Sequence, residues 1–284
     1  MDLPVSYTAP FGAVTTLVLL VLHQLAERFL LRRPHPFADL ERGNAARAIE
    51  RTGQVLGISL IAGGVVSGCL RGDGVAADAP WVAAYALAAL VLLEVTGQLG
   101  TRLLVRSKLP GEVARGNAAA GVAAAGHYVA TSLIISRCIA GHDLATLGNS
   151  MAFFALAEVT LLVSVTAFRG LTTYDDSEEI LGENLPAALS YAGITIGIGI
   201  LLGRAVEGAF IGWLPSLKAF GLSTLAIAVF YPIRQLIVEL LLIGGRVCLR
   251  GGKLDDGVRA RNVGIGAMEG ITYVAAALLV TSIA

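Results

Sequence analysis

The sequence predicts an all-α, polytopic membrane protein with about eight transmembrane helices in four parallel hairpin repeats. Hydrophobic residues make up 55% of the 284 residues and charged residues only 15%, against roughly a quarter in soluble domains. The mean hydropathy is +0.73. Long apolar segments recur along the chain, and an Asn residue precedes every second one. Lipid rather than water is therefore the expected solvent for most of the surface.

Eight apolar segments are each long enough to cross a bilayer. A helix rises about 1.5 Å per residue, so roughly 20 residues cross the ~30 Å of hydrocarbon. Each odd-numbered segment leads through a short connection into the next even-numbered one. The first segment should remain in the mature protein, because the residues before it carry no basic charge typical of a signal peptide. The predicted spans are residues 11–31, 45–70, 81–105, 118–140, 147–168, 185–210, 217–247 and 263–284.

Basic residues predict the orientation of these spans. Sixteen of the 21 Lys and Arg residues lie in or beside the connections from each odd segment to the next even one. The positive-inside rule places these connections in the cytoplasm and both termini outside. The third connection is also acidic, although the rule weighs Lys and Arg rather than net charge. Arg234 falls inside a span, and the opposite side holds only Arg71, Arg137, Arg204 and Lys218.

Internal repetition appears at the start of every even-numbered segment. These segments follow Asn44, Asn117, Asn184 and Asn262, and each Asn is followed four residues later by Ala or Gly. Two of these segment starts share the string Gly-Asn-Ala-Ala, and the second and fourth repeats share Tyr-Val-Ala. The chain therefore reads as a duplicated four-helix unit. We predict two membrane domains, residues 1–142 and 143–284.

The Asn-x-Ala-Ala helix starts and the spaced glycines that follow them resemble the bacterial inner-membrane family labelled domain of unknown function 350, of the YjfL type. The resemblance covers nearly the whole chain as two tandem copies. The later repeats depart from the motif, because Pro186 stands where Ala is expected and Val263 and Gly264 follow Asn262. The resemblance implies membrane location and an association with genes for polyamine synthesis and envelope stress. It supplies no activity.

The four Asn residues have two interpretations. An Asn directly before an apolar run is a favoured N-cap, whose side-chain oxygen accepts a hydrogen bond from an otherwise unpaired N–H group. Four positive helix ends on one face are also suited to hold an anion or line a vestibule. The sequence leaves both interpretations open.

Small residues at four-residue spacing predict close packing between the even-numbered helices. Such spacing places small side chains along one helix face, so that a neighbouring helix approaches closely. In the fourth repeat, Ile271 occupies the first of these positions. The predicted packing residues are Gly53, Gly57, Gly126, Gly193 and Gly197.

Ionisable residues inside the spans are the candidate functional residues. A charge at the bilayer centre costs roughly 2.5 to 3.5 kcal/mol, so each needs a partner, a proton or water. Glu94 and Glu239 each lie 23 residues before the Asn of their repeat, and Glu158 lies 26 residues before its own. With Arg234 they form a candidate intramembrane polar site. One interpretation is that these groups pair and fix helix register. The other is a proton or cation pathway in which both repeats present a carboxylate to one central cavity.

Other recognised chemistry is absent from the sequence. The cysteines form no metal-ligand spacing, and His127 alone is more typical of a hydrogen-bonded residue than of a proton shuttle. No Walker loop, Gly-x-Ser-x-Gly elbow or His-Glu-x-x-His motif occurs. Balanced charge argues against nucleic acid. We therefore expect no enzyme, no cofactor and no metal site.

The leading functional hypothesis is a regulated path for an ion or a small polar solute in the bacterial inner membrane. The alternative is a non-transporting structural or envelope-stress component that binds lipid or a protein partner through its basic connections. An enzyme with an unfamiliar pocket is a third class. The expected partners are the lipid bilayer and a homo-oligomer or membrane-stress protein. The sequence does not identify a ligand.

Overall fold

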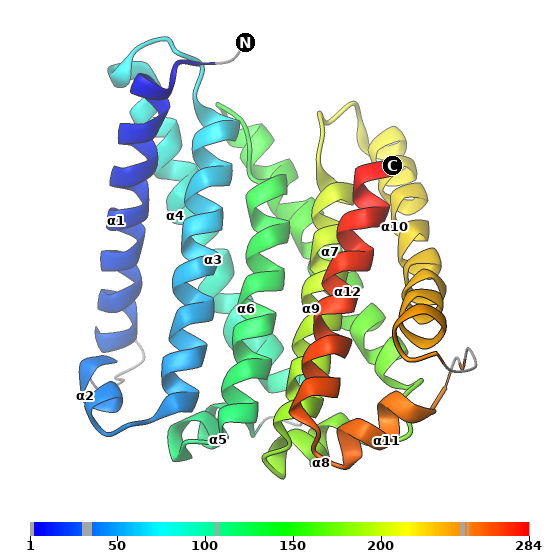
Figure 1. The fold of residues 1–284 in the computed structure, drawn as a ribbon. Helices are drawn as coiled ribbons and strands as arrows, with labels where there is room; N and C mark the ends of the chain where they lie inside the picture. The colour runs from blue at the N-terminus through cyan, green and yellow to red at the C-terminus, as the bar shows by residue number, and fades with distance from the viewer. Residues whose placement is uncertain (1–2, 30–35, 106–107, 245–247, 249, 284) are drawn as a thin grey trace.

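A computed structural model of the chain describes residues 3–29, 36–105, 108–244, 248 and 250–283 (Figure 1). The predicted span ends at residues 31, 247 and 284 lie outside the described residues. The same holds for four of the basic residues counted for orientation: Arg32, Arg33, Arg106 and Arg246.

The described residues form eight long helices, and all eight are apolar and long enough to cross a membrane. The predicted all-α membrane architecture is therefore confirmed, and no β-strand occurs within the described ranges. The long helices are α1 (Val5–Phe29), α3 (Ala45–Cys69), α4 (Val75–Leu104), α6 (Ala118–Cys138), α7 (Leu144–Arg169), α9 (Leu185–Val206), α10 (Trp213–Gln235), which continues into the π-helical segment η1 (Leu236–Leu242), and α12 (Val263–Ile283).

Four short helices connect the two long helices of each hairpin. They are α2 (Pro36–Glu41), α5 (Leu109–Arg115), α8 (Asp176–Leu181) and α11 (Lys253–Arg259). All four lie at one end of the bundle, and α1 begins and α12 ends at the opposite end (Figure 1). We call these the short-helix end and the termini end. Each repeat is thus a long helix, a short helix, an Asn and a second long helix.

The second long helices of the four repeats stand side by side in one row, in the order α3, α6, α9 and α12 (Figure 1). The first long helices pack onto this row. Helix α4 contacts α3 and α6, α7 contacts α6 and α9, and α10 contacts α9 and α12. The four repeats therefore form a line and do not surround a central axis.

Candidate functional site

The four Asn residues are N-caps of the helices in the row. Each side-chain oxygen accepts a hydrogen bond from the backbone N–H three residues later, at 2.9 Å for Asn44 and 3.2 Å for Asn117. The corresponding distances are 3.3 Å for Asn184 and 3.2 Å for Asn262. Each cap satisfies one of the four N–H groups that a helix start leaves unpaired.

Three of these Asn side chains also tie one repeat to the next. The amide nitrogen of Asn44 donates to the carbonyl of Val113 at 3.1 Å, in the short helix of the second repeat. Asn117 and Asn184 donate in the same way, each at 2.9 Å, to carbonyls of α8 and α11. Asn117 is 2% exposed and Asn184 is fully buried. These two caps are therefore closed by protein and do not line an anion vestibule.

The predicted packing glycines lie where helices of the row touch. A Cβ atom added to Gly53 or Gly57 would overlap Ala125 or Ser132 of α6. One added to Gly126 would overlap Ala192 of α9. In the second half of the chain, Gly193 and Gly197 press against the backbone of α12 at Gly270 and Tyr273. Backbones that approach this closely exclude water and lipid from the row.

Glu94 belongs to a buried polar cluster between α1, α3 and α4. His23 Nδ1 is hydrogen-bonded to Glu94, and His23 Nε2 lies 3.6 Å from a carboxylate oxygen of Glu27. Arg51 forms an ion pair with Glu27 and lies 3.3 Å from His23 Nε2. Two carboxylates thus share one guanidinium and one imidazole.

Arg234 and Glu239 belong to a second cluster, at the other end of the row. Arg234 pairs with Glu269 of α12 at 3.1 Å, and its guanidinium lies 4.1 Å from the centre of the Tyr273 ring. Glu239 lies in the π-helical segment, a rare geometry that often marks functional sites. One of its buried carboxylate oxygens has no hydrogen-bond partner among the described residues. The pair with Glu269 neutralises Arg234, and Glu239 remains as an additional acidic group.

The expectation that Glu94 and Glu239 share one cavity is wrong. Glu94 lies on the floor of an apolar groove of about 480 Å³ between α1 and α4, whereas Glu239 lies against α12. Helices α6, α7 and α9 separate the two, because the repeats stand in a line. Equal distance from the Asn along the sequence does not bring the two carboxylates together: Glu94 lies ten residues before the end of α4, whereas Glu239 lies three residues before the end of η1.

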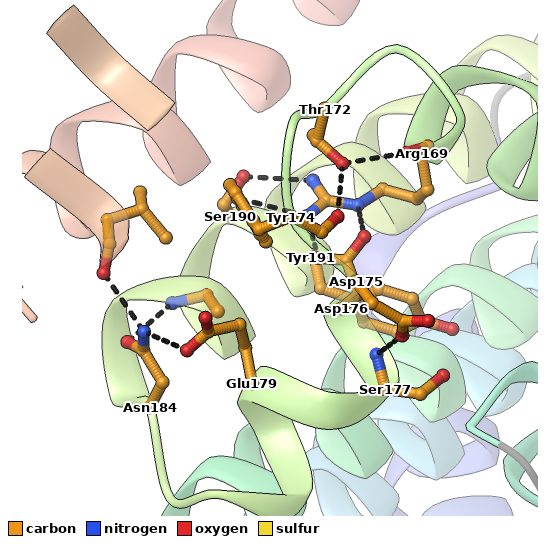
Figure 2. Close-up of polar contacts among 12 residues, drawn as sticks. Arg169, Thr172, Tyr174, Asp175, Asp176, Ser177, Glu179, Asn184, Ser190 and Tyr191 are labelled. Carbon is orange, nitrogen blue, oxygen red and sulfur yellow. Dashed lines mark hydrogen bonds and ion pairs between the residues drawn. The ribbon is translucent and has the colours of Figure 1, made fainter. Parts of the chain in front are cut away.

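A polar cavity of about 380 Å³ opens at the short-helix end around Arg169. Arg169 donates to Ser190 and to Tyr174 at 3.1 Å each, and it pairs with Asp176 at the start of α8 (Figure 2). Burial raises the pKa of Tyr174, which lies between α7 and α8, above its ordinary value. The Tyr191 hydroxyl is buried at this cavity without a hydrogen-bond partner in the part of the chain that the structure describes.

Glu158 lies on the inward face of α7, between this cavity and a second one. The second cavity, of about 690 Å³, lies at the termini end and is lined by Ser150, Arg137 and Glu207. Ser150, Glu158 and Arg169 all lie on the buried face of α7. Glu158 is 6% exposed and accepts hydrogen bonds from Thr131 at 3.1 and 3.3 Å.

His127 is the other ionisable group beside Glu158. Its Nε2 lies 3.7 Å from the Glu158 carboxylate and 3.3 Å from the carbonyl of Thr96. Its Nδ1 is buried without a hydrogen-bond partner among the described residues. The imidazole and the carboxylate therefore lie close enough to share a proton through a small movement of either side chain.

Several buried polar residues were not predicted from the sequence. His23 and Glu27 lie within the first predicted span and Arg51 was counted among the basic residues of a connection, but none of the three was predicted to belong to a polar site; His23 and Glu27 are buried. The available signal was spacing, because His23 and Glu27 lie four residues apart and therefore share one helix face. Glu269 carries no such signal. Its pairing with Arg234 depends on how α10 and α12 meet.

Metal-ligand geometry is absent from the described residues, where no group of three or more His, Cys, Asp or Glu side chains is placed to hold an ion. All three cysteines are free thiols; Cys69 and Cys138 are buried and Cys248 is half-buried.

Comparisons with known proteins identify the family. A family model described as Domain of Unknown Function (DUF350) matches residues 5–140 and again residues 142–284. A UPF0719 transmembrane protein of Aquifex aeolicus (strain VF5) is 26% identical over 179 residues, which cover 61% of this chain and 63% of that protein. The alignment thus spans less than two-thirds of that relative. No solved structure matches. The predicted resemblance, with two tandem copies, is confirmed; the boundary after residue 142 stays a prediction.

Proposed function

Because the chain belongs to the DUF350 family of multi-pass membrane proteins, whose description assigns no activity, we propose from its geometry that it is a gated proton pathway and not an enzyme. The observation that carries the proposal is the position of Glu158 between two cavities at opposite ends of the bundle. A carboxylate at this depth is costly without a function or a partner.

The buried face of α7 sets the order of the groups along the proposed pathway, from one cavity to the other. Glu158 follows Ser150 at the termini-end cavity by eight residues and precedes Val165 at the short-helix cavity by seven. These separations correspond to about 12 and 10 Å along the helix axis. Phe154 and Leu161 are buried on the same face on either side of Glu158. They close the pathway in this conformation, so water must enter from one side at a time.

The donors around Glu158 favour a proton over a metal cation. Thr131 donates to the Glu158 carboxyl group, and His127 is the adjacent group that takes up or releases a proton. Oxygen-binding cations such as Ca²⁺ need about six to eight oxygen ligands, which this site does not supply. A proton needs one carboxylate and an intermittent water chain.

We also propose an orientation and a location. The short-helix end is placed in the cytoplasm and both termini outside, in the inner membrane of a bacterium. The basic residues of the described short connections, including Arg115 and Arg259, support this orientation.

Liposome flux measurements test the pathway. The purified chain is reconstituted with a pH-sensitive dye inside, and proton flux is driven by a potassium diffusion potential. Glu158→Gln, which keeps size and removes the charge, should abolish the flux. Glu94→Gln and Glu239→Gln are the controls, since they change carboxylates of two other long helical segments outside the pathway, and each should retain the native rate. Equal flux through Glu158→Gln and the native protein would refute the proposed role.

A structural or partner-binding role is the second candidate. The row of close-packed helices, tied at three points by Asn side chains of which two are buried, supports it. Absence of flux from the native protein under any driving potential would favour this role. An envelope-stress protein or anionic lipid would then be the partner to seek.

A further inference from the structure

The groove between α1 and α4 lies outside the proposed proton pathway and has a volume of about 480 Å³. This volume is typical of small-molecule sites, which range from about 300 to 1,000 Å³. Leu25 and Phe29 of α1 and Leu87 of α4 line the groove and are exposed, so in a membrane the groove opens to lipid. Among the described lining residues, only Glu94 and Gln98 are polar. An occupant of the groove is therefore largely apolar and enters from the bilayer.

Glu94 belongs both to this groove and to the buried polar cluster. Its side chain is 16% exposed, whereas the side chain of His23, to which it is hydrogen-bonded, is 5% exposed. His23, Glu27 and Arg51 form the rest of the cluster, and none of the three lines the groove. Gln98 lies four residues after Glu94 and therefore on the same face of α4. One carboxylate and one amide thus form the polar part of a wall that is otherwise apolar.

The charge that this wall presents to the groove is negative. Glu94 is the only ionisable residue among the described lining residues, and the guanidinium of the cluster, on Arg51, forms its ion pair with Glu27. Ten residues, or about 15 Å of helix, separate Glu94 from the end of α4, so its carboxylate lies within the span. A carboxylate at such a depth is stabilised by a partner of opposite charge. A cation in the groove supplies this charge from the side that the chain leaves open.

We propose that the groove binds lipophilic organic cations, in which apolar groups shield or spread the positive charge. A compact ammonium ion loses its hydration when it enters hydrocarbon, and this desolvation is costly. The cost is smaller for a larger ion, so a cation of this class reaches the depth of Glu94. Its apolar groups pack against Leu22, Leu90 and Val91, and its charge lies beside the Glu94 carboxylate. The site does not include Glu158, so this proposal and the proton pathway can fail separately.

Two probes of similar size and opposite charge test the proposal. Tetraphenylphosphonium is a cation and tetraphenylborate is an anion, and both carry four phenyl groups around one central atom. Binding of each ion to the purified protein in detergent is measured separately by equilibrium dialysis. Tetraphenylphosphonium should bind saturably, and tetraphenylborate should not. Equal affinity for the two ions would mean that the groove recognises apolar surface alone, and absence of saturable tetraphenylphosphonium binding would equally overturn the proposal.

A charge variant locates the binding at Glu94. Glu94→Gln keeps the size and hydrogen-bonding capacity of the side chain and removes its charge, so it should weaken tetraphenylphosphonium binding by roughly tenfold or more. Glu239→Gln removes a carboxylate of the second cluster and should bind the cation as the native chain does. Native affinity in Glu94→Gln would contradict the assigned site.

A variant that fills the groove tests the same site without a change of charge. Val91→Trp adds bulk at an exposed position of the groove wall, so the fold should be kept and cation binding lost. Val159→Trp, at an exposed position of α7, is the matched control and should bind normally. Circular dichroism of both variants checks the helical fold. Undiminished binding by a folded Val91→Trp variant would place the cation elsewhere and refute the proposal.

Discussion

At the scale of single residues, the buried Asn caps do more than start helices. Asn184 caps α9, and its amide donates to Glu179 at 2.7 Å and to the carbonyl of Val258 at 2.9 Å. Asn184→Ala removes the cap, worth about 1 kcal/mol, and leaves buried acceptors unpaired at about 1 to 3 kcal/mol. We expect the free energy of unfolding to fall by roughly 2 to 4 kcal/mol.

The fourth Asn provides the control for this prediction. Asn262 is exposed, and its side chain caps its own helix without a cross-repeat hydrogen bond among the described residues. Asn262→Ala should therefore cost only the cap, about 1 kcal/mol. Unfolding in bicelles by titration with a denaturing detergent, followed by circular dichroism, measures both losses. Equal losses would show that the cross-repeat hydrogen bonds contribute nothing.

Asp143, which caps α7, gives a pH-dependent prediction. The hydrogen bond from the Thr146 amide, at 2.8 Å, holds the pKa of Asp143 below its ordinary value. A carboxylate whose pKa folding lowers stabilises the fold above its unfolded pKa, about 3.9, and loses this effect as the pH falls through the folded value. Amide protection in the first turn of α7 should therefore fall below about pH 4. Hydrogen exchange, corrected for intrinsic rates, measures it. Asp143→Asn should keep a cap and lose this pH dependence.

Residue spacing located candidate groups but not their partners. The 23-residue distance from Glu94 and Glu239 to their Asn residues predicted the same depth for both. It contained no information on lateral position, which depends on the order of the helices in the row. Glu158 was a candidate from the sequence, but its place between two cavities depends on side chains from several helices. No single segment encodes that arrangement.

At the scale of elements, the row depends on glycines that tolerate no side chain. A Cβ atom at Gly193 would overlap the backbone of Gly270, so Gly193→Ala must push α9 and α12 apart. We expect a destabilisation of about 1 to 3 kcal/mol, as for other overpacked sites. Gly148→Ala is the matched control, since its Cβ meets nothing within 4 Å, and it should be neutral or slightly stabilising. The same unfolding titration measures both, and equal effects would contradict the packing argument.

Hydropathy predicted the long helices and missed the short ones. A mainly apolar segment of more than 20 residues gives a strong hydropathy signal. All eight long helices were therefore predicted from the sequence. The connecting helices α2, α5, α8 and α11 have only six or seven residues and lie among charged side chains. Such segments are too short for a periodic pattern to be distinguished from a polar loop.

At the scale of the whole molecule, one interface used three times explains the linear arrangement. Each inner helix of the row presents one small-residue face to the helix before it and a different one to the helix after it, as Ala125 and Gly126 do on α6. The resulting contacts run from α3 through α6 and α9 to α12 in a line. The sequence shows both sets of small residues, but not which helix meets which. Ile271 at the last position is the clearest sequence signal that the line stops there.

Orientation in the membrane is a property of the whole chain, and it follows from the uneven placement of basic residues. Lys and Arg in short connections resist translocation and are attracted by anionic lipids of the cytoplasmic leaflet. Asp73 at the termini end and Asp256 at the short-helix end are both exposed, and the positive-inside rule counts neither. In intact bacteria, a membrane-impermeant maleimide should label Asp73→Cys and leave Asp256→Cys unlabelled. Both should react after permeabilisation, with the unsubstituted protein as background. The reverse pattern would place the short helices outside and would reverse the direction of the proposed pathway.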